Sequence, residues 1–285
     1  MIRSILLPLA EKSIPSNTLN YAFWLAKKEG SCIQALAVVD VAAFEIPVLG
    51  TPDGFMPSVV SPPLQESQAL FDEMTALAEE RLDRFAKQCA SGNIPCTTET
   101  KFGIPGEVIA RTAVAHDIVV MSRSGYSRIP NTQEKLDPLV SQVIRESIRP
   151  VLVAGSELPA EGDINNILVA YDGSLHAGRA LLVAAELGAR PGVQCTVVVV
   201  APSEELGEQT LSPAEAFLYH HGVMPKKRVV VGVKPSDVIC DLVTSVETDI
   251  LVMGAYGHSP IREVLFGSTT ERVLSQCTAT VILQS

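Results

Sequence analysis

Short apolar runs alternate along the chain with longer segments in which apolar residues recur at helical spacing. The apolar runs predict strands at 2–9, 32–41, 96–101, 150–154, 165–171, 194–201, 228–233, 249–253 and 279–283. The helical spacing predicts helices at 15–29, 64–91, 106–115, 174–189, 235–246 and 268–276. Strands and helices that alternate in this way predict parallel strands joined by helical crossovers, with helices on both faces of the sheet.

The same order of elements occurs twice, which predicts two repeated units. The clearest match lies between 116–122 and 248–254, where an aspartate precedes an apolar strand in both segments. We therefore expect an N-terminal unit at 1–155 and a C-terminal unit at 164–285. The segment 155–163 carries Gly, Ser, Pro and acidic residues and is the expected linker.

The two halves differ between their second and third strands. Residues 44–63 are rich in Pro and Gly and predict a long loop. A long amphipathic helix is expected at 64–91, whereas the second half offers only a short one at about 212–221. The apolar stripe of the long helix consists of Leu70, Met74, Leu77, Leu82 and Phe85.

The strongest candidate for chemistry follows the strand at 249–253. Gly254 and Gly257 lie at its exit, where glycines allow a tight turn and a close approach of the backbone to a ligand. Gly267 and Ser268 then open a helix, whose free amides and dipole favour an anion. These two pieces predict a phosphate site. It is not a Walker A loop, because no Gly-Lys-Ser/Thr follows.

The first half does not keep these features. Ser122 replaces the first glycine, although Gly125 matches the second. Asp137 and Pro138 stand in place of the Gly-Ser pair, and a carboxylate beside a residue without an N–H group opposes phosphate binding. We therefore expect the first site to be degenerate.

Charge and composition narrow the function further. The chain has 285 residues and a net charge of −10, which argues against a nucleic-acid partner. Residues 1–155 carry 14 basic and 17 acidic groups, and 156–285 carry 8 and 15, so the second half has a net charge of −7. A divalent cation would therefore help a di- or triphosphate to bind there. The six cysteines contain no Cys-x-x-Cys pair, and no run is long enough to span a membrane, so we expect a cytoplasmic protein with reduced thiols.

These features resemble the universal stress protein family, in the form of a tandem two-domain member. Nucleotide-binding members share the pattern Gly-x2-Gly-x9-Gly-(Ser/Thr), and 254–268 matches it in full. The segment 167–174, in which Asp172-Gly-Ser follows an apolar strand, is similar to the opening strand of the family. In the first half, 9–13 lacks this Asp-Gly-Ser. The resemblance covers nearly the whole chain as two repeats.

The resemblance implies two open five-stranded parallel sheets of the adenine-nucleotide-binding, Rossmann-like type, with the ligand at the carboxyl ends of the strands. It also implies that the repeats pair through their last strands as a pseudo-dimer; a homodimer is a further possibility. The implied nucleotide-binding residues are Ala170, Tyr171, Asp172 and Val200 for adenine and ribose, Met253, Gly254, Tyr256 and Gly257 for ribose and α-phosphate, and Gly267, Ser268, Thr269 and Thr270 for the phosphates.

Several of these residues also have purely structural interpretations. The glycine pair suits an ordinary strand-to-helix turn, and Ser268 suits a helix N-cap. Asp172 is either a ribose or adenine contact or a turn residue before the next helix. Arg262 either neutralises phosphate or faces solvent, and we expect Tyr256 to act through its backbone.

Other polar residues give no catalytic or metal site. His220 and His221 are adjacent on a helix and so point in different directions. We interpret Asp237 and Asp241 as part of a solvated helix face rather than as an acid–base pair.

Three functions follow, in order of preference. The first is a stress or signalling module that binds ATP, with Mg²⁺, in the C-terminal repeat. The second is a slow ATPase, which requires only positioning and electrostatic stabilisation. The third is an interaction scaffold without nucleotide, which uses the apolar loop at 44–63.

Overall fold

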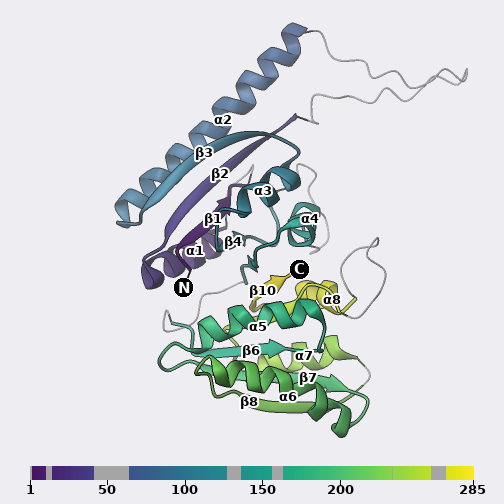
Figure 1. Cartoon of the computed structure of the whole chain (residues 1–285). Helices are drawn as coiled ribbons and strands as arrows, with labels where there is room; N and C mark the ends of the chain where they lie inside the picture. Colours follow the sequence, from purple (N-terminus) through teal and green to yellow (C-terminus); the bar gives the residue numbers. More distant parts are fainter. Residues whose placement is uncertain are drawn as a thin grey trace, which may run out of the picture.

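The computed structural model describes residues 2–10, 15–41, 64–126, 136–155, 163–232, 234–257 and 268–285, with side chains of the long helix from residue 68 onward. Helices and strands alternate as the sequence predicts (Figure 1). The first half contains β1 (Ser4–Pro8), α1 (Ser16–Glu29), β2 (Cys32–Asp40), α2 (Leu64–Ser91), β3 (Cys96–Gly103), α3 (Pro105–Ala113), β4 (Ile118–Met121), α4 (Pro138–Glu146) and β5 (Val151–Val153). The second half contains β6 (Asn166–Ala170), α5 (Leu175–Gly188), β7 (Gln194–Ala201), α6 (Glu204–His220), β8 (Lys226–Val231), α7 (Pro235–Ser245), β9 (Ile250–Gly254), α8 (Ser268–Gln276) and β10 (Thr280–Gln284).

All the strands form one ten-stranded sheet in the order β3-β2-β1-β4-β5-β10-β9-β6-β7-β8. Every pairing within each half is parallel. The halves meet where β5 and β10 pair antiparallel, with Leu152 opposite Ile282. The prediction of two five-stranded parallel sheets joined as a pseudo-dimer is therefore confirmed.

An aspartate fixes the central strand in both halves. One carboxylate oxygen of Asp117 accepts hydrogen bonds from the backbone amides of Arg3 and Ser4, at 2.7 and 3.0 Å. In the second half, Asp249 binds the amides of Asn165 and Asn166 in the same way, at 2.7 and 2.9 Å. This repeated bond explains the aspartate in the matching segments 116–122 and 248–254.

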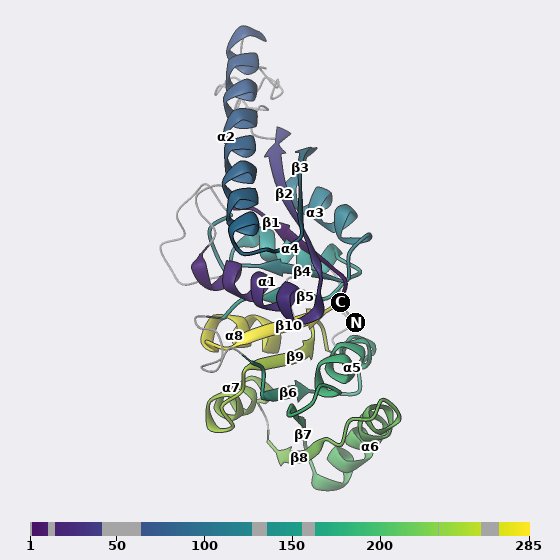
Figure 2. The same cartoon turned by 90° about the vertical axis from the view of Figure 1, so that its left-hand side faces the viewer.

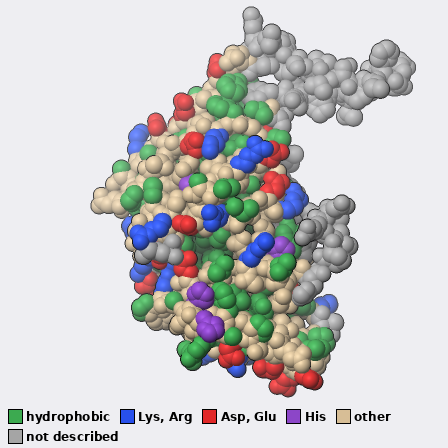
Figure 3. All heavy atoms as spheres, in the orientation of Figure 1, with side chains coloured by type: hydrophobic (Ala, Val, Ile, Leu, Met, Phe, Trp, Pro, Cys, Tyr) green, Lys and Arg blue, Asp and Glu red, His purple; other side chains and the backbone are tan. Residues whose placement is uncertain are grey.

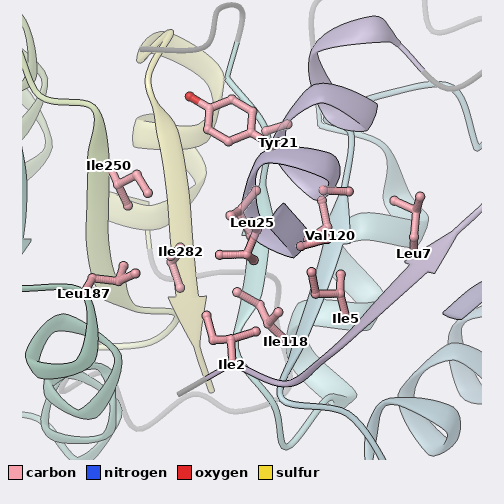
Figure 4. Packing of buried hydrophobic residues seen from close by; sticks show 14 of the residues in the cluster. Ile2, Ile5, Leu7, Tyr21, Leu25, Ile118, Val120, Leu187, Ile250 and Ile282 are labelled. Atoms are coloured by element: carbon pink, nitrogen blue, oxygen red, sulfur yellow. The ribbon is translucent and has the colours of Figure 1, made fainter. Parts of the chain in front are cut away.

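Helices cover both faces of the sheet. In the second half, α5 and α6 lie on one face and α7 lies on the other (Figure 2). The largest buried cluster includes residues from both halves, so the halves share a core. Figure 4 shows this arrangement, with Tyr21 and Leu25 of α1 beside Ile250 and Ile282 of the second half. Burial of apolar side chains across this boundary stabilises both halves at once.

Polar contacts across the boundary add to the shared core. Glu29 at the end of α1 pairs with Arg190 of the second half at 2.8 Å, and both side chains are largely buried. The Arg190 guanidinium also lies 5.8 Å from the ring centroid of Trp24, within cation–π range. Burial raises the pKa of the Tyr21 hydroxyl, although a hydrogen bond with Thr280 of β10 lowers it in part.

Arg123 connects the two halves from the exit of β4. Its guanidinium donates to the carbonyl of Leu274 in the last turn of α8 and to that of Ala279, both at 2.6 Å. It donates a longer bond, 3.4 Å, to the carbonyl of Ala154. A cation at a helix C-terminus also interacts favourably with the helix dipole. Burial lowers the pKa of Arg123, but a guanidinium stays charged at neutral pH.

Two expectations about helices need correction. The helix predicted at 212–221 begins much earlier, at Glu204, and Pro213 lies inside it. The hydroxyl of Ser203 caps its start by accepting from the amide of Leu206, and Pro213 is exposed, so the bond that proline removes faces water.

The predicted stripe of α2 is buried only toward the end of the helix. Leu82 and Phe85 are core residues, whereas Leu70 and Leu77 are 40% and 51% exposed. Figure 2 shows that the first turns of α2, which carry Leu70, extend beyond the sheet, whereas Leu77 lies off the buried stripe of Met74, Ala78, Leu82 and Phe85. The loop expected at 44–63 and most of the linker lie outside the described residues.

Charged side chains of both signs are spread over the face drawn in Figure 3, with acidic groups gathered at the lower end of the second half. Among the described residues, no helix combines the length and apolar character needed to cross a lipid bilayer.

We predict that Arg123→Ala lowers the free energy of unfolding by about 2–4 kcal/mol, because it leaves buried carbonyls of both halves without a donor. Urea unfolding followed by circular dichroism measures this. The matched control is Arg84→Ala, which removes an exposed helix ion pair with Glu80 and should change stability by less than about 0.5 kcal/mol. Equal effects of the two substitutions would contradict the role given to Arg123.

Candidate functional site

The candidate site lies at the carboxyl ends of β6 and β9, which are adjacent parallel strands. Ala170 and Met253, the paired residues near these ends, bring the two exits side by side. Asp172, Gly173 and Ser174 follow β6 and lead into α5. Open α/β sheets bind ligands at this edge, where helices begin.

Asp172 and Gly257 come together across the two exits. A Cβ atom placed on Gly257 would lie 2.9 Å from the Oδ2 atom of Asp172, so only glycine fits without moving the carboxylate. The other oxygen of Asp172 accepts from the amide of Ser174 at 2.9 Å, and Gly173 adopts a φ of +79°. Asp172 is therefore a turn residue whose exposed carboxylate also faces the second predicted segment.

Ser174 fixes the start of α5. Its hydroxyl accepts from the amide of Ala177 at 3.2 Å and so caps the helix. The same hydroxyl donates to the carbonyl of Tyr256 at 3.4 Å, which ties the helix start to the exit of β9. The backbone of Tyr256 thus takes part in the site, as expected.

Gly254 has a packing role that the motif did not reveal. A Cβ atom there would lie 2.6 Å from the backbone nitrogen of Ala177 and 2.8 Å from the carbonyl carbon of His176. No side chain fits between β9 and the first turn of α5. Gly254 therefore allows α5 to approach the sheet closely, which places the capped helix start beside the site.

The start of α8 supplies donors to the same region. Ser268 is its first residue and is exposed, and Thr269 is half-buried. Thr270 is buried, and its hydroxyl donates to the carbonyl of Ala255 at 3.0 Å. This bond holds the helix start against the exit of β9 and occupies the hydroxyl proton that the motif offered to phosphate. Gly267, His258 and Arg262 lie outside the described residues.

The remaining predicted site residues do not all lie on the same face of the sheet. Ala170 and Val200 are partly buried on the face covered by α7 and α8, beside Val230. Met253 lies deeper on that face, in the core. The ring of Tyr171 instead packs against the opposite face, so its side chain does not join them. Burial, with a smaller effect of Asp172, raises the pKa of the Tyr171 hydroxyl.

Tyr256 brings contacts that the sequence did not reveal. Its ring meets that of His176 edge-on, with centroids 5.4 Å apart. Burial raises the pKa of its hydroxyl, and Arg145 at the end of α4 lowers that pKa in part. Glu146, next to Arg145, raises the same pKa, so the end of α4 brings charges of both signs to the edge of the second site. No sequence signal places α4 there, because this proximity follows from the pairing of β5 with β10.

The matching region of the first half is filled by its own side chains. The buried carboxylate of Asp137 accepts from the amides of Tyr126 and Leu139, at 2.9 and 3.0 Å. Asp137 is the N-cap of α4 and so takes the place of an external anion at that helix start. The hydroxyl of Tyr126 accepts from the amide of Ser122 at 3.1 Å, and burial raises its pKa to about 12. The sequence indicated the carboxylate but not the tyrosine.

Comparisons with known proteins agree with this geometry. The model of the universal stress protein family matches residues 163–283. Over 293 aligned residues the chain is 24% identical to the universal stress protein Slr1230 of Synechocystis sp., with 99% of both chains covered. A universal stress protein structure from Archaeoglobus fulgidus superimposes with a TM-score of 0.74 at 21% identity, covering 99% of this chain and 98% of that one. A protein of unknown function from Pseudomonas aeruginosa gives 0.63 at 16% identity, covering 99% and 92%.

The two structural likenesses establish the shared fold over the full length. The family match falls on the half that carries the glycine motif and the capped start of α5. The relative from Synechocystis extends the similarity across both repeats. Residues 163–283 thus match the universal stress protein family, and over both repeats the chain is similar to a universal stress protein and shares the fold of a solved one.

Proposed function

We propose that the second half binds an adenine nucleotide, ATP together with Mg²⁺, and that the chain acts as a nucleotide-dependent stress or signalling module. The observation that carries this proposal is the close approach of Gly257 to Asp172, beside the exposed start of α8. A glycine that faces an exposed carboxylate at a strand exit, near the start of a helix, suits a ligand with a sugar and a phosphate chain.

Each part of the site suits one part of a nucleotide. Ala170 and Val200 offer a partly buried apolar surface to an adenine ring. The carboxylate of Asp172 accepts hydrogen bonds from ribose hydroxyls. Ser268 and Thr269 provide amides and hydroxyls to the phosphates at the positive end of the α8 dipole. The backbone of Tyr256 and Gly257 lies at the same strand exit, beside Ser174 and Asp172.

The charge of this half argues for a cation with the phosphates. Its net charge of −7 repels a free triphosphate, and Mg²⁺ neutralises part of that charge. Among the described residues, no cluster of His, Cys, Asp or Glu is arranged to hold a metal by itself. We infer that Mg²⁺ binds together with the phosphates and not alone.

We infer that the first half binds no nucleotide. Asp137 already accepts from the amide of Leu139 in the first turn of α4 and from that of Tyr126, which is buried beside Ser122. A phosphate group would have to displace a carboxylate that is covalently part of the chain.

We predict that Gly257→Val weakens ATP binding at least tenfold, because the new side chain collides with Asp172. Calorimetric titration of the nucleotide-stripped protein in Mg²⁺ measures the affinity, and circular dichroism checks the fold. Gly178→Ala is the matched control, since its new Cβ atom meets no atom within 4 Å. Unchanged affinity in Gly257→Val would refute the proposed site.

We also predict one nucleotide per chain. Asp137→Asn in the first half should leave the affinity within about twofold, whereas Asp172→Asn should weaken binding by about tenfold, since a hydrogen bond that involves a charged group contributes on the order of 1.5–3 kcal/mol. The same titration gives both stoichiometry and affinity. Two sites per chain, or equal losses in both variants, would contradict a working second half beside an inactive first half.

A further inference from the structure

A second hollow opens at the opposite edge of the second half, at the amino ends of β6, β7 and β8. Its volume is about 290 Å³, and it is bordered by Val246, the residue that ends α7. The nucleotide site lies at the other end of the same strands. At about 3.3 Å per residue, the length of β6 separates the two by roughly 15 Å.

Five polar side chains share one face of the sheet at this hollow, and we call them the amino-edge donor set. Strand register places them on the face that α7 covers, because they are paired with, or two residues from, core residues of that face. The donor set consists of Asn166, Gln194, Thr196, Lys226 and Arg228. Each of these side chains carries at least one hydrogen-bond donor, and none is acidic.

The two cations of the set have no acidic partner among the described residues. Neither Lys226 nor Arg228 forms an ion pair there, whereas Lys227, between them, pairs with Glu215 of α6 at 3.1 Å. Two carboxylates follow Val246 before β9: that of Asp249 is held by the amides of Asn165 and Asn166, and Glu247 is exposed. Three of the eight basic residues after residue 155 are concentrated in this one strand of an acidic half.

The first half provides an internal comparison. The registers of β1 to β3 and β6 to β8 make Glu99 the counterpart of Arg228. Glu99 accepts from Gln34 at 2.6 Å and pairs with Lys101 at 3.2 Å, so the polar groups of that face satisfy one another. The second half has a cation in place of this carboxylate, and among its described donors Asn166 gives a long bond of 3.4 Å to the carbonyl of Glu247.

The same comparison holds at the start of β4 and β9. In the first half the hydroxyl of Ser4 lies 2.6 Å from the Nδ1 atom of His116. In the second half Thr248 takes the position of His116, and its buried hydroxyl has no hydrogen-bond partner among the described residues. The hydrogen-bonded pair of Ser4 and His116 is thus replaced by a threonine hydroxyl without a partner among the described residues, although the Nε2 atom of His116 is also buried without one there.

From this arrangement we propose that the amino-edge donor set binds a small phosphorylated metabolite, with the phosphate held by Lys226 and Arg228. A guanidinium fork and an ammonium are the groups that recognise phosphate best, and Gln194, Asn166 and Thr196 add neutral donors. The hollow is larger than an inorganic phosphate needs, which leaves room for a small organic part.

The test uses glycerol 3-phosphate as the probe and glycerol as its uncharged match. Titration of the ¹⁵N-labelled full chain followed by NMR should shift the amides of Gln194, Thr196 and Lys226 with glycerol 3-phosphate only. The double variant Lys226→Gln/Arg228→Gln should weaken binding at least tenfold. Lys227→Gln should change it less than threefold, because Lys227 borders the hollow in the same strand but its ammonium pairs with Glu215.

Three results would overturn the proposal. They are shifts confined to the amides near Gly257 and Ser268, an equal loss in Lys227→Gln, and no saturable shift at the amino edge. Repeating the titration with saturating Mg²⁺ and ATP separates the two sites, since the amino-edge shifts should persist. If ATP does not bind but the amino-edge shifts remain, only the proposed nucleotide function fails.

Discussion

The antiparallel pairing of β5 with β10 is the interaction on which the whole architecture depends. β5 has only three residues and would be a weak edge if its half stood alone. By pairing with β10 it becomes a central strand, and the ten-stranded sheet has only β3 and β8 as its edge strands. The shared core around Tyr21 and Ile282 and the bonds of Arg123 all require this pairing.

Arg123 also shows that the pairing is not symmetric. The match between the repeats places Ala255 at the position of Arg123, so the second half sends no equivalent guanidinium back. The first half therefore holds the last turn of α8, and the first turn of that same helix carries Ser268 and Thr269. A rigid helix transmits position along its length, so the first half helps to place Ser268 and Thr269 in the second half.

The strands and most helices could be predicted because their apolar residues are buried in simple patterns. β4 is a clear case, since all four of its residues are buried and its sequence is a plain apolar run. The start of α6 could not be predicted, because Pro213 normally marks a helix boundary and only its exposed position makes it tolerable. The predicted stripe of α2 was wrong at Leu70, because sequence periodicity carries no information on where the sheet ends, and at Leu77, because the buried face passes through the small Ala78 instead.

At the candidate site, the motif predicted which segments meet but not what each residue does there. Gly254 is required by the backbone of α5, and the hydroxyl of Thr270 is used by the carbonyl of Ala255. The ring of Tyr171 packs on the other face of the sheet. These roles depend on contacts between segments more than 10 residues apart in the chain, which local spacing cannot encode.

Asp137 has a consequence for how the chain responds to its ligand. A carboxylate tethered at the start of α4 is present at a constant effective concentration, whatever the concentration of metabolites in solution. The anion position at the start of α4 is therefore always occupied by the carboxylate of Asp137. A pair of identical units could couple two binding events, but this chain has one variable unit attached to a constant one. Under the proposed function, nucleotide binding should follow a simple hyperbola, graded rather than switch-like.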